Sequence, residues 1–290
     1  MTATPTIHTP SAPPTLLTPA PDLFARRADR LRQLAPAQAL GPWLDWLAAL
    51  CTAQHRAFEQ EGSVPHNDIG ATTAMGSAAL LGRIAAIRWT LISALPTDRC
   101  AGVGPRWELA PSDLASHIER NLLLAQAATI GTGRDYEDVL TAAAMQVAWT
   151  ADARRSQAVG TAADANAGTC PHCGSAALGS ILLAGGGLAG LRYQECCLCG
   201  CRWNTVRARC TLCAAGSVVD YLSLEDAHPA VAAETCDQCH GYTKLFFQSK
   251  AIQVEPLADD VATLALDVLV GERGYARTAP NLFLCEGEAA

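Results

Sequence analysis

Two stretches decide how the C-terminal half of this chain folds: Thr-Cys-Pro-His-Cys-Gly-Ser at residues 169–175 and Glu-Cys-Cys-Leu-Cys-Gly-Cys at residues 195–201. Each stretch contains two cysteines that are separated by two residues. The same spacing returns at residues 210–213 and 236–239. The cysteines at 170, 173, 196 and 199 therefore each recur forty residues later. A fixed period indicates a duplicated unit, and it predicts which cysteine pairs belong together.

The spacing of each pair is typical of a metal site. Two intervening residues let both thiolates face one ion from a tight turn, while backbone N–H groups of the turn donate to the sulfurs. A second such turn closes a tetrahedral site of four sulfurs. We predict a first metal site that consists of Cys170, Cys173, Cys196 and Cys199. A second site consists of Cys210, Cys213, Cys236 and Cys239.

The four-cysteine pattern leaves the identity of the metal open, but it restricts the reactions that the metal could catalyse. Tetrahedral sulfur sites suit zinc and also iron, and the spacing alone does not decide between them. Closed sites leave no coordination position for a substrate, which disfavours hydrolytic metal catalysis. The sequence also lacks the G-x-S-x-G, H-E-x-x-H and P-loop motifs. We therefore predict no catalytic residues, no bound organic cofactor and no enzymatic activity.

The residues that end the cysteine turns differ between the two units. Gly174 and Gly200 follow the second cysteine of their pairs, where a left-handed backbone is useful and glycine adopts it without strain. Ala214 and His240 occupy these positions in the second unit. We expect the turns of the second site to be looser or more strained.

Five cysteines and several histidines lie outside the predicted ligand sets. We expect Cys197 and Cys201 to be spare thiols on the surface of the first unit, with a redox or alternative-ligand role as the other possibility. We place Cys51 in the core, Cys100 at a helix end and Cys285 in the tail. The histidines at positions 172, 228 and 240 are expected to be spectators rather than ligands.

Composition and charge restrict the compartment and the partners. An odd total of 13 cysteines, eight of them in C-x-x-C pairs, is typical of metal binding in a reducing compartment, not of disulfides. The net charge of −7 argues against a nucleic-acid partner. Residues 1–21 lack the apolar segment of a secretory signal, and the apolar stretch 171–191 is interrupted by a glycine triplet that fits a hairpin tip. We predict a cytoplasmic protein without membrane insertion.

The 290 residues are enough for two domains. Apolar residues recur at three- and four-residue steps in the first half, for example at Trp43, Leu47 and Leu50, and predict a bundle of five or six helices. The predicted segments are a disordered leader at 1–21, a helical domain at 22–156, a linker at 157–168, a first four-cysteine ribbon at 169–204, a second at 205–250, and a C-terminal helix and tail at 251–290.

The last segment is predicted to contain one amphipathic helix that packs on the metal domain. Pro256 suits its first turn. Its apolar face is formed by Val254, Leu257, Val261, Leu264 and Val268, and its acidic residues Asp259, Asp260 and Asp267 lie elsewhere. The predicted fold class is thus an N-terminal all-α bundle, two tandem modules of rubredoxin or zinc-ribbon type, and a C-terminal helix.

Several motifs around the cysteines point to one family. They are Cys170-Pro171-His172-Cys173-Gly174-Ser175, Gly190-Leu191-Arg192-Tyr193, Cys196-x-Leu198-Cys199-x-x-x-Trp203, Arg209-Cys210-x-x-Cys213, Ala233-Glu234-x-Cys236-Asp237-x-Cys239, Val254-Glu255-x-x-Ala258-Asp259-Asp260, Leu266-Asp267 and Gly274-Tyr275-Ala276-Arg277. In the helical half, the run from Arg26 to Ala35 followed by Leu40-Gly41 joins them. Together they resemble the formate dehydrogenase accessory protein family FdhE.

The resemblance implies a cytoplasmic maturation factor that is needed for active formate dehydrogenase. Such a factor contacts the catalytic subunit before that subunit is exported through the twin-arginine pathway. The resemblance also implies rubredoxin-like iron in the cysteine sites, so iron is favoured over zinc. Two alternatives stay open: a rubredoxin-like one-electron carrier, and a zinc-ribbon interaction module, whose nucleic-acid-binding form the acidic net charge disfavours.

Overall fold

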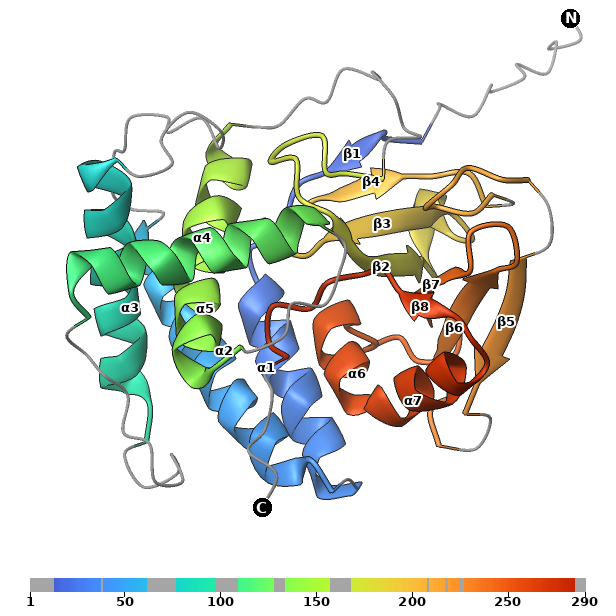
Figure 1. The fold of residues 1–290 in the computed structure, drawn as a ribbon, viewed down its shortest axis with the longest axis horizontal. Coiled ribbons are helices and arrows are strands. Elements are labelled where there is room, and N and C mark those ends of the chain that lie inside the picture. The colour runs from blue at the N-terminus through green and yellow to red at the C-terminus, as the bar shows by residue number, and fades with distance from the viewer. Residues whose placement is uncertain are drawn as a thin grey trace, which may run out of the picture.

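Helices form the first half of the protein and a sheet forms most of the second half (Figure 1). The computed structural model describes residues 13–37, 39–61, 77–96, 109–127, 134–156, 168–207, 209–216, 219–224 and 227–284. Its helices in the first half are α1 (Leu23–Leu34), α2 (Gly41–Glu61), α3 (Ala78–Ala94), α4 (Pro111–Ala127) and α5 (Tyr136–Arg155). The predicted helical bundle is therefore confirmed.

Helix α5 is the centre of this bundle. It packs against α2, α3 and α4, and its alanines at 142–144, 148, 151 and 153 are buried, which lets the neighbouring helices approach closely. Its start is fixed by a capping box: the Asp135 carboxylate accepts from the Asp138 N–H, and the Asp138 carboxylate accepts from the Asp135 N–H. Gln146 and Thr150 of α5 contact the first cysteine site, as described below.

The second half is built on one sheet that contains both cysteine units. Its strands are β1 (Leu16–Leu17), β2 (Ala177–Leu182), β3 (Arg192–Cys196), β4 (Arg202–Asn204), β5 (Val219–Ser223), β6 (Val231–Cys236), β7 (Gly241–Phe247) and β8 (Ala276–Arg277). The order across the sheet is β1-β4-β3-β2-β7-β6-β5, and β8 pairs with β7. The turn between β2 and β3 holds the glycine triplet, as predicted for a hairpin tip.

The two cysteine units repeat the same strand plan. In the first unit β2, β3 and β4 form an antiparallel meander, and in the second β5, β6 and β7 do the same. The units are joined where the first strand of one pairs in parallel with the last strand of the other, at Ser180–Leu245, Ile181–Phe246 and Leu182–Phe247. The tandem modules are therefore fused into a continuous sheet.

The predicted disordered leader needs a correction in its last part. Leu16 and Leu17 form β1, which pairs with Trp203 and Arg202 on β4. The Tyr193 hydroxyl donates to the Pro14 carbonyl at 2.8 Å, and this contact holds the segment on the sheet. Because β4 would otherwise be an open edge, the N-terminal segment gains order by covering it. Residues 1–12 lie outside the described part of the chain.

The single C-terminal helix that we predicted is wrong, because it is broken at Thr263 into α6 (Pro256–Ala262) and α7 (Leu264–Glu272). The buried ammonium of Lys244 donates to the carbonyls of Asp260 and Thr263, so it binds the backbone at the break. Val268 is 62% exposed and does not belong to the packed face. The Glu255 carboxylate caps α6, and Pro256 stands in its first turn as predicted.

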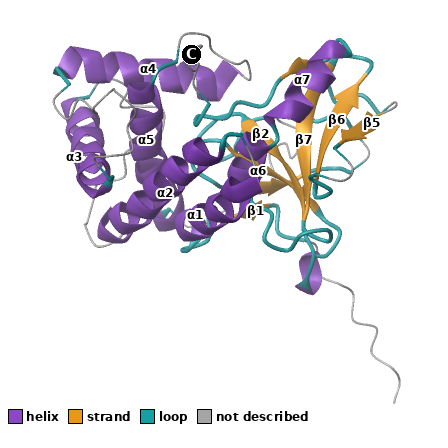
Figure 2. Cartoon of the chain, turned by 90° about the horizontal axis from the view of Figure 1, so that it is seen from below, coloured by secondary structure: helices purple, strands orange, loops and turns teal. Residues whose placement is uncertain are grey.

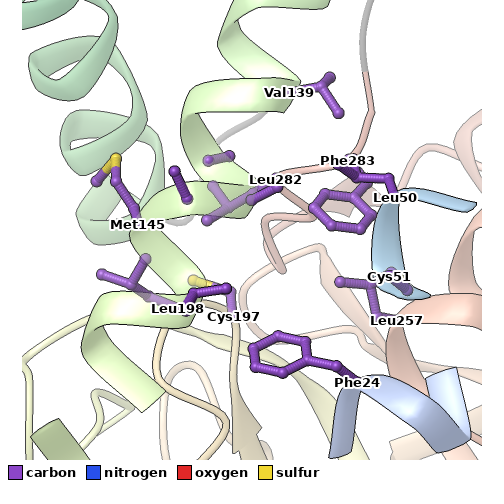
Figure 3. Packing of buried hydrophobic residues seen from close by; sticks show 14 of the residues in the cluster. Phe24, Leu50, Cys51, Val139, Met145, Cys197, Leu198, Leu257, Leu282 and Phe283 are labelled. Carbon is purple, nitrogen blue, oxygen red and sulfur yellow. The ribbon is translucent and has the colours of Figure 1, made fainter. Parts of the chain in front are cut away.

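The helices and the sheet share one apolar core. Helix α6 packs against α1, α2 and β2, and Figure 2 shows it between α1 and the sheet. The close-up in Figure 3 shows Phe24 of α1, Met145 of α5 and Leu257 of α6 in this core, together with Cys197 and Leu198 of the first cysteine unit. Leu266 and Val270 of α7 join a second cluster on the sheet, with Ile181 and Phe246 among its members.

None of the helices in the described ranges is both long and apolar enough to cross a membrane. Cys100, Cys285 and residues 157–167 of the linker predicted at 157–168 fall outside those ranges. The predicted boundaries between segments otherwise remain a prediction.

Candidate metal centres

The first site brings together the four sulfurs that the sequence grouped. The turn before β2 supplies Cys170 and Cys173, and the turn between β3 and β4 supplies Cys196 and Cys199. The Cys173 sulfur lies 3.4 Å from that of Cys196 and 3.6 Å from that of Cys199, and the Cys170 and Cys199 sulfurs are 3.5 Å apart. A tetrahedron of sulfurs around zinc, with bonds of roughly 2.3 Å, has edges of roughly 3.8 Å. The arrangement therefore fits one tetrahedral ion.

The turns of the first site have the backbone that the sequence predicted. Gly174 and Gly200 have φ values of 75° and 70°, in the left-handed region that glycine adopts freely. The N–H groups of Leu198 and Cys199 both point at the Cys196 sulfur at 3.4 Å. Such donors stabilise a thiolate and orient it toward an ion.

Two side chains of helix α5 donate hydrogen bonds to the backbone of the second turn of this site. The Gln146 amide donates to the Cys197 carbonyl at 2.9 Å, and the Thr150 hydroxyl donates to the Cys199 carbonyl at 3.2 Å. Leu23 of α1 fills the space beside Gly200, where an added Cβ would lie 2.7 Å from its side chain. The first site is thus a junction between the helices and the sheet. This role could not be read from the cysteine spacing.

The expectation that Cys197 and Cys201 are surface thiols is wrong. Cys197 is 3% exposed and Cys201 is fully buried. The Cys197 sulfur lies 3.8 Å from the Ala125 carbonyl of α4, because the helical region covers this side of the turn. Cys51 is fully buried in the helical core, as predicted.

The second site has the same four-sulfur plan but lies at the surface. The turn before β5 supplies Cys210 and Cys213, and the turn between β6 and β7 supplies Cys236 and Cys239. The sulfurs of Cys210 and Cys239 are 3.9 Å apart, and those of Cys213 and Cys236 are 3.8 Å apart. These distances also fit one tetrahedral ion of roughly 3.8 Å edge. Cys213 and Cys239 are exposed.

The turns of the second site are strained where the sequence predicted a difference. Ala214 has φ 60° and His240 has φ 52°, so both adopt the left-handed conformation that glycine adopts in the first site. For residues with a Cβ this conformation costs roughly 1–2 kcal/mol each. The duplicated backbone is retained, and its stability at these two positions is lower.

A C-terminal segment supports the strained turn at His240. The N–H of Ala276 on β8 donates to the His240 carbonyl at 2.8 Å. The Tyr275 hydroxyl donates to the carboxylate of Asp237, inside the same turn, at 2.6 Å. Tyr275 and Ala276 belong to a motif that carried the family resemblance, and here they hold the turn in place.

Burial and the neighbouring thiols shift the pKa of the cysteines in both clusters. In the first site, hydrogen bonds from Cys173, Cys196 and Cys199 hold the pKa of the Cys170 thiol well below its usual range. Burial raises the pKa of Cys196 and Cys199 well above it. In the second site, burial raises the pKa of Cys210 to about 12. Four thiolates this close together need a positive ion between them, so each cluster can hold a metal ion.

Buried ion pairs connect the first site to both ends of the chain. Arg27 of α1 lies 3.0 Å from Glu255, which caps α6, and 3.8 Å from Glu195, the residue before Cys196. Arg202 on β4 binds the other side of Glu195 at 2.6 Å. Arg30 of α1 makes two hydrogen bonds to Asp259 of α6. The sequence pattern places Asp259 away from the apolar face of its helix, but the structure buries it at this contact.

A second buried network stabilises the break between α6 and α7. Lys244 of β7 binds Asp260 at 2.9 Å and Asp267 at 2.6 Å, and Arg277 binds the same two carboxylates at 2.5 and 3.0 Å. Burial acts to raise the pKa of Asp260, but Arg277 and Lys244 together lower it to about 2. Asp260, Asp267 and Arg277 all belong to motifs that carried the resemblance, and their role here is structural.

One further group of potential metal ligands lies in the helical region, at His117, Asp135 and Asp138. Its atoms already have partners: Asp138 accepts from the Asp135 N–H and from Arg120, and lies 2.8 Å from the His117 ring. Burial acts to raise the pKa of Asp138, but these hydrogen bonds lower it to about 2. The group therefore works as the cap of α5.

Comparison with known proteins agrees with the arrangement of helices and cysteine units. The sequence models described as "FdhE, N-terminal", "FdhE, central domain" and "FdhE, C-terminal domain" match residues 12–88, 169–207 and 208–284. The chain belongs to the FdhE family. It is an FdhE homologue, a formate dehydrogenase accessory protein.

FdhE relatives match over almost the full length of both chains. The chain is 34% identical to the "Protein FdhE homolog" of Pseudomonas aeruginosa, over 95% of this chain and 94% of that one. It is 30% identical to "Protein FdhE" of Escherichia coli O1:K1 / APEC, over 95% and 92%. The crystal structure of the FdhE protein from Pseudomonas aeruginosa matches with a TM-score of 0.70 at 28% identity, covering 95% of this chain and 100% of that chain.

Proposed function

We propose that this protein is a maturation factor that binds the catalytic subunit of formate dehydrogenase in the cytoplasm, before that subunit is exported. The observation that supports the proposal best is the FdhE similarity, which extends over 95% of this chain and includes both cysteine units. The joint core of helices and sheet supplies a rigid body for a binding protein.

We infer that the eight cysteines bind two metal ions, and we favour iron because of the family resemblance. The sulfur distances of 3.4–3.9 Å fit tetrahedral ions at both sites. When bound, each ion would neutralise four thiolates and link two turns, and iron would in addition accept or release one electron. The chain contributes the N–H donors of the turns, and α5 fixes the first site.

We further infer that the protein is not an enzyme. Its clusters are closed by four cysteines each, so that a bound ion has no open position for a substrate. Three buried cations of the described helices and sheet, Arg27, Lys244 and Arg277, are engaged in ion pairs. These groups stabilise the fold.

The test of the main proposal is a pull-down of the tagged full chain, without air, from cells that make formate dehydrogenase. We expect the catalytic subunit to co-purify, and deletion of this protein to abolish formate dehydrogenase activity. The wild-type chain should restore the activity. Full enzyme activity in the deletion strain would overturn the proposal, as would restoration by an unrelated four-cysteine protein.

A one-electron carrier is a second candidate, and the exposure of Cys213 and Cys239 favours it. Sulfur ligands at the surface allow electron exchange with a docked protein. Protein purified without air and then oxidised should be red-brown from ferric thiolate, and it should bleach reversibly on reduction. Colourless protein with two zinc ions would rule out both the carrier and the preference for iron.

A further inference from the structure

The two cysteine sites have the same sulfur geometry but opposite surroundings. At the first site, Cys170, Cys196 and Cys199 are at most 3% exposed. At the second site, Cys213 and Cys239 are exposed. Cys173 of the first site is only partly exposed. A competing ligand can therefore reach sulfur, and hence an ion, more easily at the second site, where two of the four cysteines are exposed.

The supports of the two sites differ as well. At the first site, α5 holds the backbone of the ligand turn through Gln146 and Thr150, and both turns end in glycine. At the second site, Tyr275 and Ala276 support one turn, but both turns end in strained residues with a Cβ, Ala214 and His240. A strained turn releases part of its strain when its cysteines leave the ion, which lowers the barrier to opening.

We propose that the second site is an exchange site, which passes its ion to competing thiolate or chelating ligands, whereas the first site is a permanent structural site. Exchange replaces the four metal–sulfur bonds with bonds to the competing ligand, and the freed thiolates take up protons from water. No electron is transferred. The inference rests on the proposed binding of two ions. It assigns different roles to the two sites, a division of labour, although their cysteine spacing is the same.

The proposal predicts two separate phases of ion release. The full chain is loaded with two equivalents of Zn²⁺ without air, and 4-(2-pyridylazo)resorcinol then captures the released ion. We expect one equivalent to leave at least about tenfold faster than the other, because burial and two unstrained turns protect only one site. Alkylation with N-ethylmaleimide after the first phase should label peptides with Cys210, Cys213, Cys236 and Cys239.

Matched substitutions test the physical cause. Ala214→Gly relieves one strained residue and should slow the fast phase by about tenfold without changing the slow phase. Gly174→Ala imposes the same strain on the first site, where an added Cβ meets no atom within 4 Å. It should speed the slow phase alone. Both variants keep all eight cysteines, and Ala214→Gly removes strain, so loss of the fold does not confuse the result.

The outcomes separate this proposal from the one that it rests on. If the chain binds no Zn²⁺ and contains no metal as purified, the proposed metal binding fails. If it binds two ions and both leave in a single phase, only the division of labour fails. Labelling of Cys170 or Cys196 in the first phase would likewise overturn it.

Discussion

The guanidinium of Arg27 on the first helix lies 3.0 Å from the carboxylate of Glu255, the residue that caps α6 near the other end of the chain. Both side chains are buried, and Arg27 also donates to Gln146 of α5. One cation thus connects helices α1, α5 and α6.

Arg27→Met should lower the free energy of unfolding by about 3–5 kcal/mol, because the substitution leaves Glu255 as a buried charge without its partner. Urea unfolding followed by circular dichroism measures the change. The double variant Arg27→Met/Glu255→Gln should recover part of the loss. Arg26→Met is the control, since Arg26 is paired at the surface with Asp22 and should change stability by less than about 1 kcal/mol. Equal losses at both positions would contradict the role of the buried pair.

Replacing one ligand of each site tests the pairing of the cysteines. Cys210→Ser should leave one ion per chain and unfold the second unit locally, because metal binding supplies on the order of 10 kcal/mol per site to such small units. Cys170→Ser should also remove one ion, and the double variant should remove both. Metal analysis of the purified chains gives the count. If Cys210→Ser alone removes both ions, the assignment of four cysteines to each site is wrong.

Thr150→Val should weaken the contact between α5 and the first site. It removes the hydroxyl that donates to the Cys199 carbonyl and leaves that buried acceptor unpaired, at a cost of about 1–3 kcal/mol. Thr150→Ser keeps the donor and should restore most of the stability. Thr90→Val serves as the control, because the Thr90 hydroxyl donates to the Ala86 carbonyl of its own helix at an exposed position. Urea unfolding measures the free energy of unfolding of the three variants. Equal losses in Thr150→Val and Thr90→Val would contradict the contact between Thr150 and the first site.

The cap of α5 should depend on pH. Asp138 has a pKa of about 2 in the folded protein, below the value of 3.8 for a free carboxyl, so its ionised form stabilises the fold. The contribution is present above pH 4 and is lost as the pH falls from about 4 to 2. Asp138→Asn should therefore lower the free energy of unfolding by about 2 kcal/mol at pH 7. Because acid also removes metal from cysteines, the quantity to measure is the difference between wild type and variant, which should shrink toward pH 2. The exposed Asp113, as Asp113→Asn, is the control. A difference that stays constant with pH would exclude the ionised cap.

The sequence predicts best where chemistry fixes the spacing of residues. The forty-residue repeat predicted which four sulfurs come together, and the residues at 214 and 240 predicted the strained turns. It also predicted a helical first half from the apolar steps. Each of these features depends on short sequence patterns, so it can be recognised from residues that lie near one another in the chain.

Long-range contacts could not be predicted in this way. The order of Leu16 and Leu17 comes from pairing with β4, almost 190 residues later. Asp259 and Asp260 look like the polar face of a helix, but partners on α1, β7 and β8 bury them. The break at Thr263 depends on Lys244, and the burial of Cys197 depends on α4. In each case the local structure or the burial is determined by a residue that is distant in sequence. A single sequence does not reveal which residue that is.

The parallel pairing of β2 with β7 has a consequence for synthesis of the protein. On the ribosome, β2 emerges more than fifty residues before the strand that completes its edge, and chains emerge at about 5–20 residues per second. For several seconds the first unit therefore presents an unpaired edge and α1 lacks its partner Glu255. Folding can be completed only once the C-terminal segment is released. We expect ribosome-bound chains that end before β7 to be protease-sensitive throughout, including their first cysteine unit.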